Sequence, residues 1–224
     1  LILLVKKLKS IKAKFEILAI DDGSKDKTFV KLNKIKQNYK NVKIYYNKRN
    51  MGKSYSIRKG LKKSKYNYVI LTDSDLPYFY VFSKIVKYFK KDYDFVFVNR
   101  RHKKSSIQKK DLSFYQKTRY LAGYIVSLII RSLLNLNIDG GDTQSGLKGF
   151  KKIKNFEDYE FISFKFFLDL EIFYLYRKLN KKFFSIPVKY DIDENSSIQI
   201  FSVKNFAILS ELTKVILKLK SQRY

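Results

Sequence analysis

Two short apolar segments of this chain each end abruptly in an acidic turn. Residues 68–72 (YVILT) lead into 73–76 (DSDL), and residues 17–20 (ILAI) lead into 21–24 (DDGS). Apolar runs of this length are typical of buried strands, and an open α/β sheet binds its ligands at the carboxyl ends of its strands. The pattern therefore predicts one shared nucleotide and metal site. Polar turns that only cap the following helices are the alternative.

Charge and composition narrow the classes of partner and of metal site. The 224 residues include 48 basic and 20 acidic residues, a net charge of +28, which favours nucleotides, phospholipid head groups or nucleic acid. The basic residues are scattered, so they do not choose among these partners. The absence of cysteine excludes disulfides and Cys-ligated zinc, and the single histidine, His102, excludes a multi-histidine metal site.

Hydrophobic runs in the chain are too short to span a bilayer. The longest, residues 120–130, is interrupted by Arg131 and falls below the ~20 residues required. No secretory signal is visible. We therefore expect no transmembrane segment.

Periodicity predicts alternating helices and strands. Parallel strands joined by right-handed crossovers, with helices on both faces, follow from this alternation. No linker or repeat is evident, so we predict a single domain over 1–224, with a nucleotide-binding half at about 1–100 and an acceptor-side half at about 101–224. Helices are expected at 1–11, 27–37, 53–63, 77–89, 112–136, 162–179 and 202–218, strands at 15–20, 42–46, 68–72, 93–98 and 182–190, and loops at 100–110 and 139–149.

Seven patterns occur in a fixed order along the chain. They are 17–28 (ILAIDDGSKDKT), 50–60, 73–76 (DSDL), 98–100 (VNR), 142–150 (DTQSGLKGF), 167–171 (FLDLE) and 186–188 (IPV). Together they resemble the motifs of the family-2 glycosyltransferases with a GT-A fold, and within that family the chain looks most like the polyprenyl-phosphate (dolichyl-phosphate) glucosyl- and mannosyltransferases. The family's opening strand and Pro-x-Tyr-Asn-Glu turn have no counterpart here, and a helix feeds the first expected strand, so we expect an inner strand to be missing if the chain starts at Leu1.

The resemblance implies a fold, a reaction and partners. The fold would be α/β, a Rossmann-like doubly wound and mostly parallel sheet flanked by helices. The enzyme would be an inverting hexosyltransferase that moves a hexose from a nucleotide sugar to a polyprenyl or dolichyl monophosphate. Glucose from UDP-glucose is favoured, because 142–150 looks closer to the glucosyl branch. A divalent cation, Mg²⁺ or Mn²⁺, would neutralise the leaving diphosphate. The protein would lie peripherally on the cytoplasmic face of a membrane.

The candidate site residues follow from these matches and from side-chain chemistry. A guanidinium at the end of a strand suits bidentate phosphate binding, and a lipid phosphate is already ionised, so transfer needs no general base. Arg131 is also placed to snorkel from an apolar helix. The candidates are Asp75 and Asp73 for metal, Asp21, Asp22, Lys53 and Asp73 for the nucleotide, Asp142 and Arg100 for catalysis, and Arg119, Arg131 and Gln144 for the acceptor.

Some features leave alternatives open. The amphipathic helices expected at 112–136 and 202–218 suit a membrane surface, but 112–136 would equally pack on the sheet. Asp169 and Glu171 lie two apart on an apolar helix, so we expect one to be buried and paired with a basic loop residue.

Other functions also fit parts of the sequence. The same fold also suits transfer of sugar to a glycan, and the missing opening strand also fits an inactive remnant. Charge alone suggests nucleic-acid binding, but no recognisable motif for it is present and the acidic turns would repel phosphate without metal, so we expect no nucleic-acid partner.

Overall fold

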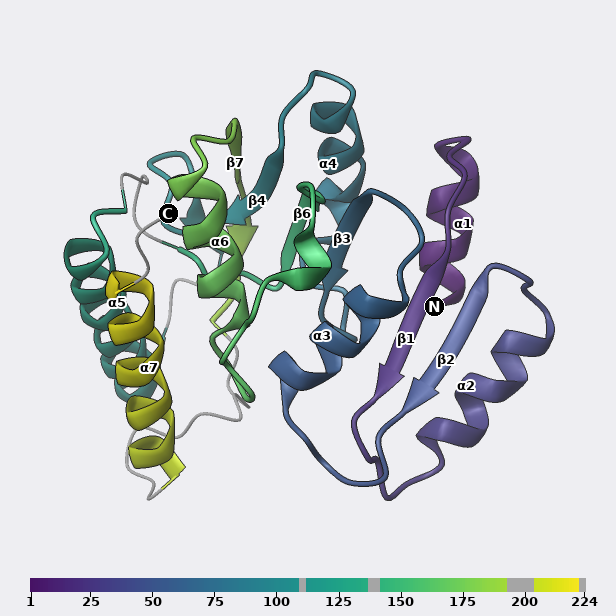
Figure 1. Cartoon of the computed structure of the whole chain (residues 1–224), viewed down its shortest axis with the longest axis horizontal. Helices are drawn as coiled ribbons and strands as arrows, with labels where there is room; N and C mark the ends of the chain where they lie inside the picture. The colour runs from purple at the N-terminus through teal and green to yellow at the C-terminus, as the bar shows by residue number, and fades with distance from the viewer. Residues whose placement is uncertain (109–111, 137–141, 193–203, 222–224) are drawn as a thin grey trace. The chain divides into compact units, whose positions relative to one another are not determined.

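The computed structural model describes residues 1–108, 112–136, 142–192 and 204–221 (Figure 1). It is an α/β structure with parallel strand pairs and flanking helices, as predicted. The chain forms two compact units, one from Leu1–Val69 with Lys152–Phe166 and one from Ile70–Lys151 with Phe167–Tyr224. The prediction that residues 1–224 act as one domain stays a prediction.

The first unit is built on a parallel strand pair. Strands β1 (Ile17–Asp21) and β2 (Val42–Tyr46) pair with Ile17 opposite Val42 and Asp21 opposite Tyr46. Helix α2 (Thr28–Gln37) packs against β2, and α3 (Lys53–Lys63) packs against β1. Helix α1 (Ile2–Ser10) and the short helix η2 (Phe156–Asp158) complete the unit. Its buried apolar side chains include Leu4, Val5, Leu8, Ile17, Val42 and Leu61.

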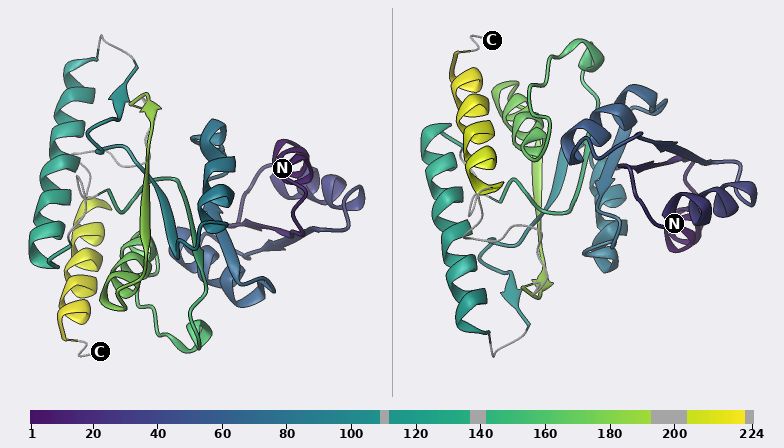
Figure 2. Two further views of the ribbon diagram at one scale, coloured as in Figure 1. Left: turned by 90° about the horizontal axis from the view of Figure 1, so that it is seen from above. Right: turned by 90° about the horizontal axis from the view of Figure 1, so that it is seen from below.

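The second unit contains a mixed sheet with strand order β3-β6-β4-β7. Strand β4 pairs antiparallel with β6 and parallel with β7. A short parallel pair joins β5 and β8. Figure 2 shows α5 and α7 side by side in both views. The bounds are β3 (Tyr68–Thr72, which enters this unit at Ile70), η1 (Phe79–Val81), α4 (Phe82–Phe89), β4 (Phe95–Asn99), β5 (Ser106–Ile107), α5 (Phe114–Leu133), β6 (Leu147–Lys151), α6 (Leu168–Lys178), β7 (Phe183–Pro187), β8 (Lys189–Tyr190) and α7 (Lys204–Ser221).

The core of the second unit is aromatic. Strand β4 is buried along its whole length, and every residue of α6 from Leu168 to Tyr176 is buried. Helix α4 approaches β6 so closely that a Cβ on Gly149 would lie 2.7 Å from both Ile85 Cγ2 and Phe89 Cζ. The rings that pack together are Phe95, Phe97, Phe150, Phe173, Tyr176 and Phe183.

Most predicted elements are confirmed, and two predictions are wrong in a way that matters for the site. Helix α6 begins at Leu168, not at residue 162, because the preceding carbonyls of Phe164 and Lys165 accept hydrogen bonds from Tyr55 and Ser54 at the start of α3. Part of the predicted loop 139–149 is strand β6, because residues 147–149 pair with β4. The predicted strand 182–190 is interrupted at residue 188.

Parts of three predicted segments lie outside the described residues, at 109–110, 139–141 and 202–203. No helix in the described ranges is both long enough and apolar enough to cross a membrane.

Candidate active site

The acidic turn of the first unit is closed by its own hydrogen bonds. Asp21 is buried at the end of β1, and its Oδ1 accepts from the Ser24 amide and hydroxyl. Asp22 Oδ1 accepts from Asn47 Nδ2 at 2.8 Å and from the Met51 amide at 2.9 Å, and Oδ2 accepts from the Gly52 amide at 2.8 Å. The Asp22 carboxylate therefore joins the turn after β1 to the turn before α3.

These contacts alter the acidity of Asp22. Partial burial raises its pKa, but the hydrogen bonds from Asn47, Met51 and Gly52 outweigh burial and hold the pKa below the ordinary 3.8. Gly23, in the turn after β1, lies against the turn before α3. It has φ +77°, and a Cβ there would lie 2.5 Å from the Arg49 carbonyl carbon. Only glycine fits this close approach of two backbones.

The start of α3 is covered by the segment 161–165 of the same unit. The Ser54 and Tyr55 amides donate to the Lys165 and Phe164 carbonyls, both at 3.0 Å. Arg58 donates to the Phe161 carbonyl at 2.7 Å. Two of the amides that a helix N-terminus would otherwise offer to an anion are thus already bonded. Lys53, the predicted nucleotide contact, is exposed at the first position of this helix.

The acidic turn of the second unit has a different environment. Asp73 follows β3, and its amide donates to the Gly146 carbonyl at 3.1 Å. A Cβ on Gly146 would lie 2.6 Å from Asp73 Oδ2 and 2.7 Å from Pro77 Cγ. The predicted metal turn and the predicted acceptor-side loop are therefore in direct contact.

Asp75 is exposed, and within the described residues its carboxylate makes no hydrogen bond or ion pair. The turn after it is strained: Leu76 has φ 54° and Tyr78 has φ 62°, with Pro77 between them. Left-handed backbone is uncommon for residues other than glycine, and such strain concentrates at functional sites.

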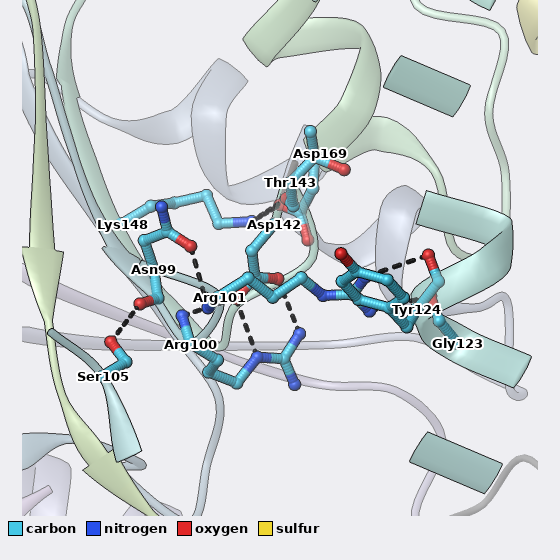
Figure 3. Close-up of polar contacts among 10 residues, drawn as sticks. All are labelled: Asn99, Arg100, Arg101, Ser105, Gly123, Tyr124, Asp142, Thr143, Lys148 and Asp169. Carbon is cyan, nitrogen blue, oxygen red and sulfur yellow. Dashed lines mark hydrogen bonds and ion pairs between the residues drawn. The ribbon is translucent and has the colours of Figure 1, made fainter. Parts of the chain in front are cut away.

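Arg100 and Asp142 form a buried ion pair at the end of β4 (Figure 3). Arg100 Nη2 donates to Asp142 Oδ1 at 2.7 Å, and its Nε and its backbone amide each donate to Oδ2 at 2.9 Å. The Asp142 side chain is 2% exposed and that of Arg100 is 32% exposed. Asp142 thus fixes the orientation of the guanidinium of a side chain that is still partly exposed.

Electrostatics keep this pair ionised. Burial raises the pKa of Asp142, but the charge and hydrogen bonds of Arg100 outweigh it, so the pKa lies below 3.8. Burial alone would lower the pKa of Arg100. The charge and hydrogen bonds of Asp142 outweigh burial and raise the Arg100 pKa. Burial raises the pKa of Tyr78 and outweighs the opposite effect of the neighbouring Arg100 charge, so the Tyr78 hydroxyl stays neutral.

The next residue, Arg101, points away from Arg100 toward the middle of α5 (Figure 3). Its guanidinium donates to the Gly123 carbonyl at 2.7 Å and the Tyr124 carbonyl at 3.2 Å, and lies 5.2 Å from the centre of the Tyr124 ring. Two consecutive arginines thus connect β4 to the Asp142 loop and to α5.

The loop after Asp142 is buried and incompletely hydrogen-bonded. Gln144 Nε2 and Ser145 Oγ are buried and have no partner among the described residues. Buried polar atoms are seldom left unbonded, and at a binding site such atoms are free for a ligand or water. Gln144 was predicted as an acceptor contact, and that assignment stays a prediction.

The two predicted acceptor arginines on α5 lie far from each other. Arg119 and Arg131 are twelve residues apart, roughly 18 Å along a helix, so one phosphate does not contact both. Arg131 lines an open hollow with Leu128, Ser132, Asn135 and Leu136.

The structure brings Arg100 and Asp142 together, and Asp73 together with the Gln144–Gly146 loop. Asp21, Asp22 and Lys53 belong to the first unit, so the predicted site shared by both acidic turns stays a prediction.

Sequence reasoning missed the buried Lys148, which pairs with Asp169 at 3.1 Å. The signal was the acidic pair on an apolar helix: Asp169 is buried and paired as expected, but with a strand lysine, and Glu171 is buried as well, so the expectation that only one would be buried is wrong.

Asp73 and Asp75 fit a divalent cation that also binds phosphate. No group of three or more acidic or histidine side chains in the described ranges is arranged to hold a metal ion. Mg²⁺ and Mn²⁺ at nucleotide sites need only one or two carboxylates, with phosphate oxygens and water as the other ligands. One exposed carboxylate beside a half-buried one is such a donor set.

Three glycosyltransferases are among the known proteins to which this chain is similar. The chain is 28% identical to a dolichyl-phosphate beta-glucosyltransferase of Dictyostelium discoideum over 205 residues, 88% of this chain and 61% of the relative. It is 34% identical over 101 residues to an uncharacterized glycosyltransferase of Synechocystis (44% of this chain, 31% of the relative). It is 32% identical over 111 residues to the putative glycosyltransferase CsbB of Bacillus subtilis (49% of this chain, 34% of the relative).

The chain thus spans less than two thirds of the length of each of these relatives. The profile described as glycosyl transferase family 2 matches residues 3–140, which is more than half of the chain. The chain therefore belongs to glycosyl transferase family 2.

Proposed function

We propose that this protein transfers a hexose, with glucose favoured, from a nucleotide sugar, with UDP-glucose favoured, to a polyprenyl or dolichyl monophosphate. The observation that carries the proposal is the contact between the Asp73 turn and the Asp142–Gly146 loop. It joins carboxylates suited to a metal–diphosphate to an arginine suited to a phosphate acceptor, within one compact unit.

In this proposal Asp75 and Asp73 bind Mg²⁺ or Mn²⁺, which supplies a Lewis acid for the leaving diphosphate. Asp142 fixes the Arg100 guanidinium through two side-chain hydrogen bonds, so that its exposed part faces the acceptor phosphate. Tyr78 adds a neutral hydroxyl beside Arg100.

The proposed reaction needs no general base. An oxygen of the ionised lipid phosphate attacks the anomeric carbon, the bond from that carbon to the diphosphate breaks, and its electron pair leaves with the nucleotide diphosphate. The anomeric centre is inverted. Asp142 has a lowered pKa and is already paired, so its role is to orient Arg100 rather than to accept a proton.

A lipid acceptor is favoured over a glycan by the surface of α5. Only Gln116 and Ile130 of this helix are buried, whereas Leu121, Ile125 and Ile129, which share one face, are 56%, 47% and 51% exposed. The helix carries Lys117, Arg119 and Arg131 and no acidic residue. An apolar face with basic neighbours suits an anionic lipid surface.

Helix α7 does not share this property to the same extent. Its side chains Leu212, Val215, Ile216 and Leu219 are buried, although Leu209 and Leu217 are exposed. We therefore assign peripheral membrane binding to α5. The cytoplasmic face of the membrane is part of the same proposal and rests on the family resemblance.

The function is tested by supplying radiolabelled UDP-glucose with Mn²⁺ and either polyprenyl phosphate or an oligosaccharide. We expect a metal-dependent, chloroform-soluble product with the lipid phosphate only. Transfer to the oligosaccharide alone would favour the glycan-acceptor function. GDP-mannose in a parallel reaction decides between the two donor sugars.

Membrane binding is tested by flotation with anionic vesicles. Replacing Leu121, Ile125 and Ile129 together by Ser should abolish flotation at low salt, because about 0.8 kcal/mol of apolar transfer free energy is lost per methylene. Leu217→Ser, at a 62% exposed position on α7, is the control and should float like the wild type. Flotation of the triple variant at the wild-type level would contradict the assignment.

A further inference from the structure

Lys148 is a charged side chain inside the core of the second unit. It lies on β6, is 3% exposed, and donates from Nζ to the Thr143 carbonyl at 2.9 Å (Figure 3). Nζ also pairs with Asp169 Oδ1 of α6 at 3.1 Å, and the Asp169 side chain is likewise 3% exposed. A lysine on a strand thus links a helix to the backbone of the loop that follows Asp142.

A buried ion pair of this kind adds little net stability over apolar side chains of similar size, since desolvation offsets the attraction. Its effect is geometric. A fixed ammonium has donors in defined directions, and Asp169 and Thr143 accept two of them. The contact sets the position of the peptide that joins Thr143 to Gln144.

That peptide lies between two contacts of the proposed site. The preceding residue, Asp142, fixes Arg100, and the loop ends at Gly146, whose carbonyl accepts from the Asp73 amide. The space at Gly146 is so tight that a shift of the loop would change its contact with the Asp73 carboxylate.

We propose that Lys148 and Asp169 are positioning residues for transfer, which fix the Asp142–Gly146 loop so that Arg100 and Asp73 keep their relative placement. This rests on the proposed function. Neither residue touches substrate or metal in this proposal, and both act through the loop backbone.

The chain provides a matched control four residues further on. Lys152 also has a mostly buried side chain, 9% exposed, that donates to backbone carbonyls and pairs with an acid. Its Nζ donates to the Ser64 carbonyl at 3.0 Å and to Glu157 Oε1 at 2.7 Å, both in the first unit. Lys152 thus makes the same kind of contact with partners that are not part of the Asp142 loop.

The test compares Lys148→Met, the double variant Lys148→Met with Asp169→Leu, and Lys152→Met. The double variant removes both charges of the pair, so Asp169 is not left as a buried carboxylate without Lys148. Amide hydrogen exchange of residues 142–147 measures the loop, thermal unfolding measures stability, and steady-state kinetics with UDP-glucose and polyprenyl phosphate measure kcat and KM.

We expect faster exchange at 142–147 and a kcat roughly 10- to 100-fold lower in both Lys148 variants, because small displacements of positioned groups have effects of that size. The double variant should recover thermal stability without recovering kcat. Lys152→Met should keep the wild-type kcat and loop exchange even where its stability falls.

A purely structural role would make kcat recover together with stability in the double variant, and that result would overturn the proposal. Unchanged exchange at 142–147 would overturn it as well. An inactive wild-type protein would instead contradict the proposed function, and the exchange measurement would still decide whether Lys148 positions the loop.

Discussion

The two acidic turns, one in each unit, look alike in sequence and are bonded differently. Asp22 accepts three hydrogen bonds from Asn47, Met51 and Gly52, so its carboxylate closes two backbone turns together. Asp75 is exposed, and in the described part of the chain it has no such partner. The comparison teaches that the first turn has a clear structural task, whereas the second presents a carboxylate with capacity for a ligand.

Replacing Asp75 should have the largest effect and should fall on activity alone. Asp75→Asn keeps the shape of the side chain and removes a negative charge, so we expect roughly thousandfold slower transfer and an unchanged unfolding midpoint. Transfer assays and thermal unfolding measure the two effects. Asp158→Asn, at an exposed position outside both turns, is the control. Near-normal turnover in Asp75→Asn would refute the metal assignment.

Asp142→Asn should reduce both activity and stability. It leaves Arg100 without its buried partner, a change that typically lowers the unfolding free energy by about 3–5 kcal/mol. The folded-state pKa of Asp142 lies below 3.8, so the carboxylate stabilises the fold fully above that value and less as the pH falls through the lower pKa. The unfolding free energies of wild type and variant, measured in urea, should therefore differ at pH 7. They should converge as the pH falls from 3.8 through the lower folded-state pKa. A constant difference across this range would contradict the ion-pair account.

Gly23→Ala tests the close approach of backbones in the first turn. The new Cβ would meet the Arg49 carbonyl carbon at 2.5 Å on a residue with φ +77°, so we expect a loss of about 2–3 kcal/mol of unfolding free energy. Gly60→Ala is the matched control, because its nearest neighbour would lie 3.6 Å away and alanine favours the helix. Equal stability of the two variants would show that the turns are looser than described.

Asp22→Asn should give the smallest loss, about 1–2 kcal/mol, because the amide can still accept at one position while its NH₂ group opposes a backbone N–H. Chemical unfolding of this variant beside Asp75→Asn compares the two turns directly. A larger loss of stability in Asp75→Asn than in Asp22→Asn would invert the comparison and refute it.

Much of the fold could be predicted from local pattern. Strands β2 and β3 and helix α3 begin and end at the predicted residues, since each is a short periodic run bounded by polar or glycine residues. The start of α6 could not be predicted, because it depends on hydrogen bonds that the residues before it make to α3, which is distant in sequence. Strand β6 was not predicted because Gly149 and Lys148 are atypical of a buried strand. Gly149 allows the close approach of α4, and Lys148 pairs with Asp169 of α6.

For the candidate site, too, the sequence predicted some features and not others. The order of residue types made Asp73, Asp75, Arg100 and Asp142 candidates for the site. It did not show that Asp142 bonds to Arg100, since the two lie 42 residues apart. Amphipathic pattern identified α5 and α7 equally. Only packing shows that one apolar face is buried and the other exposed.

The most direct test is calorimetric titration of UDP into the purified protein, with and without Mn²⁺, for the wild type and for Asp75→Asn. The account predicts that Mn²⁺ strengthens UDP binding to the wild type and has little effect on the variant. Equal UDP binding with and without Mn²⁺, or an unaltered Mn²⁺ effect in Asp75→Asn, would contradict it.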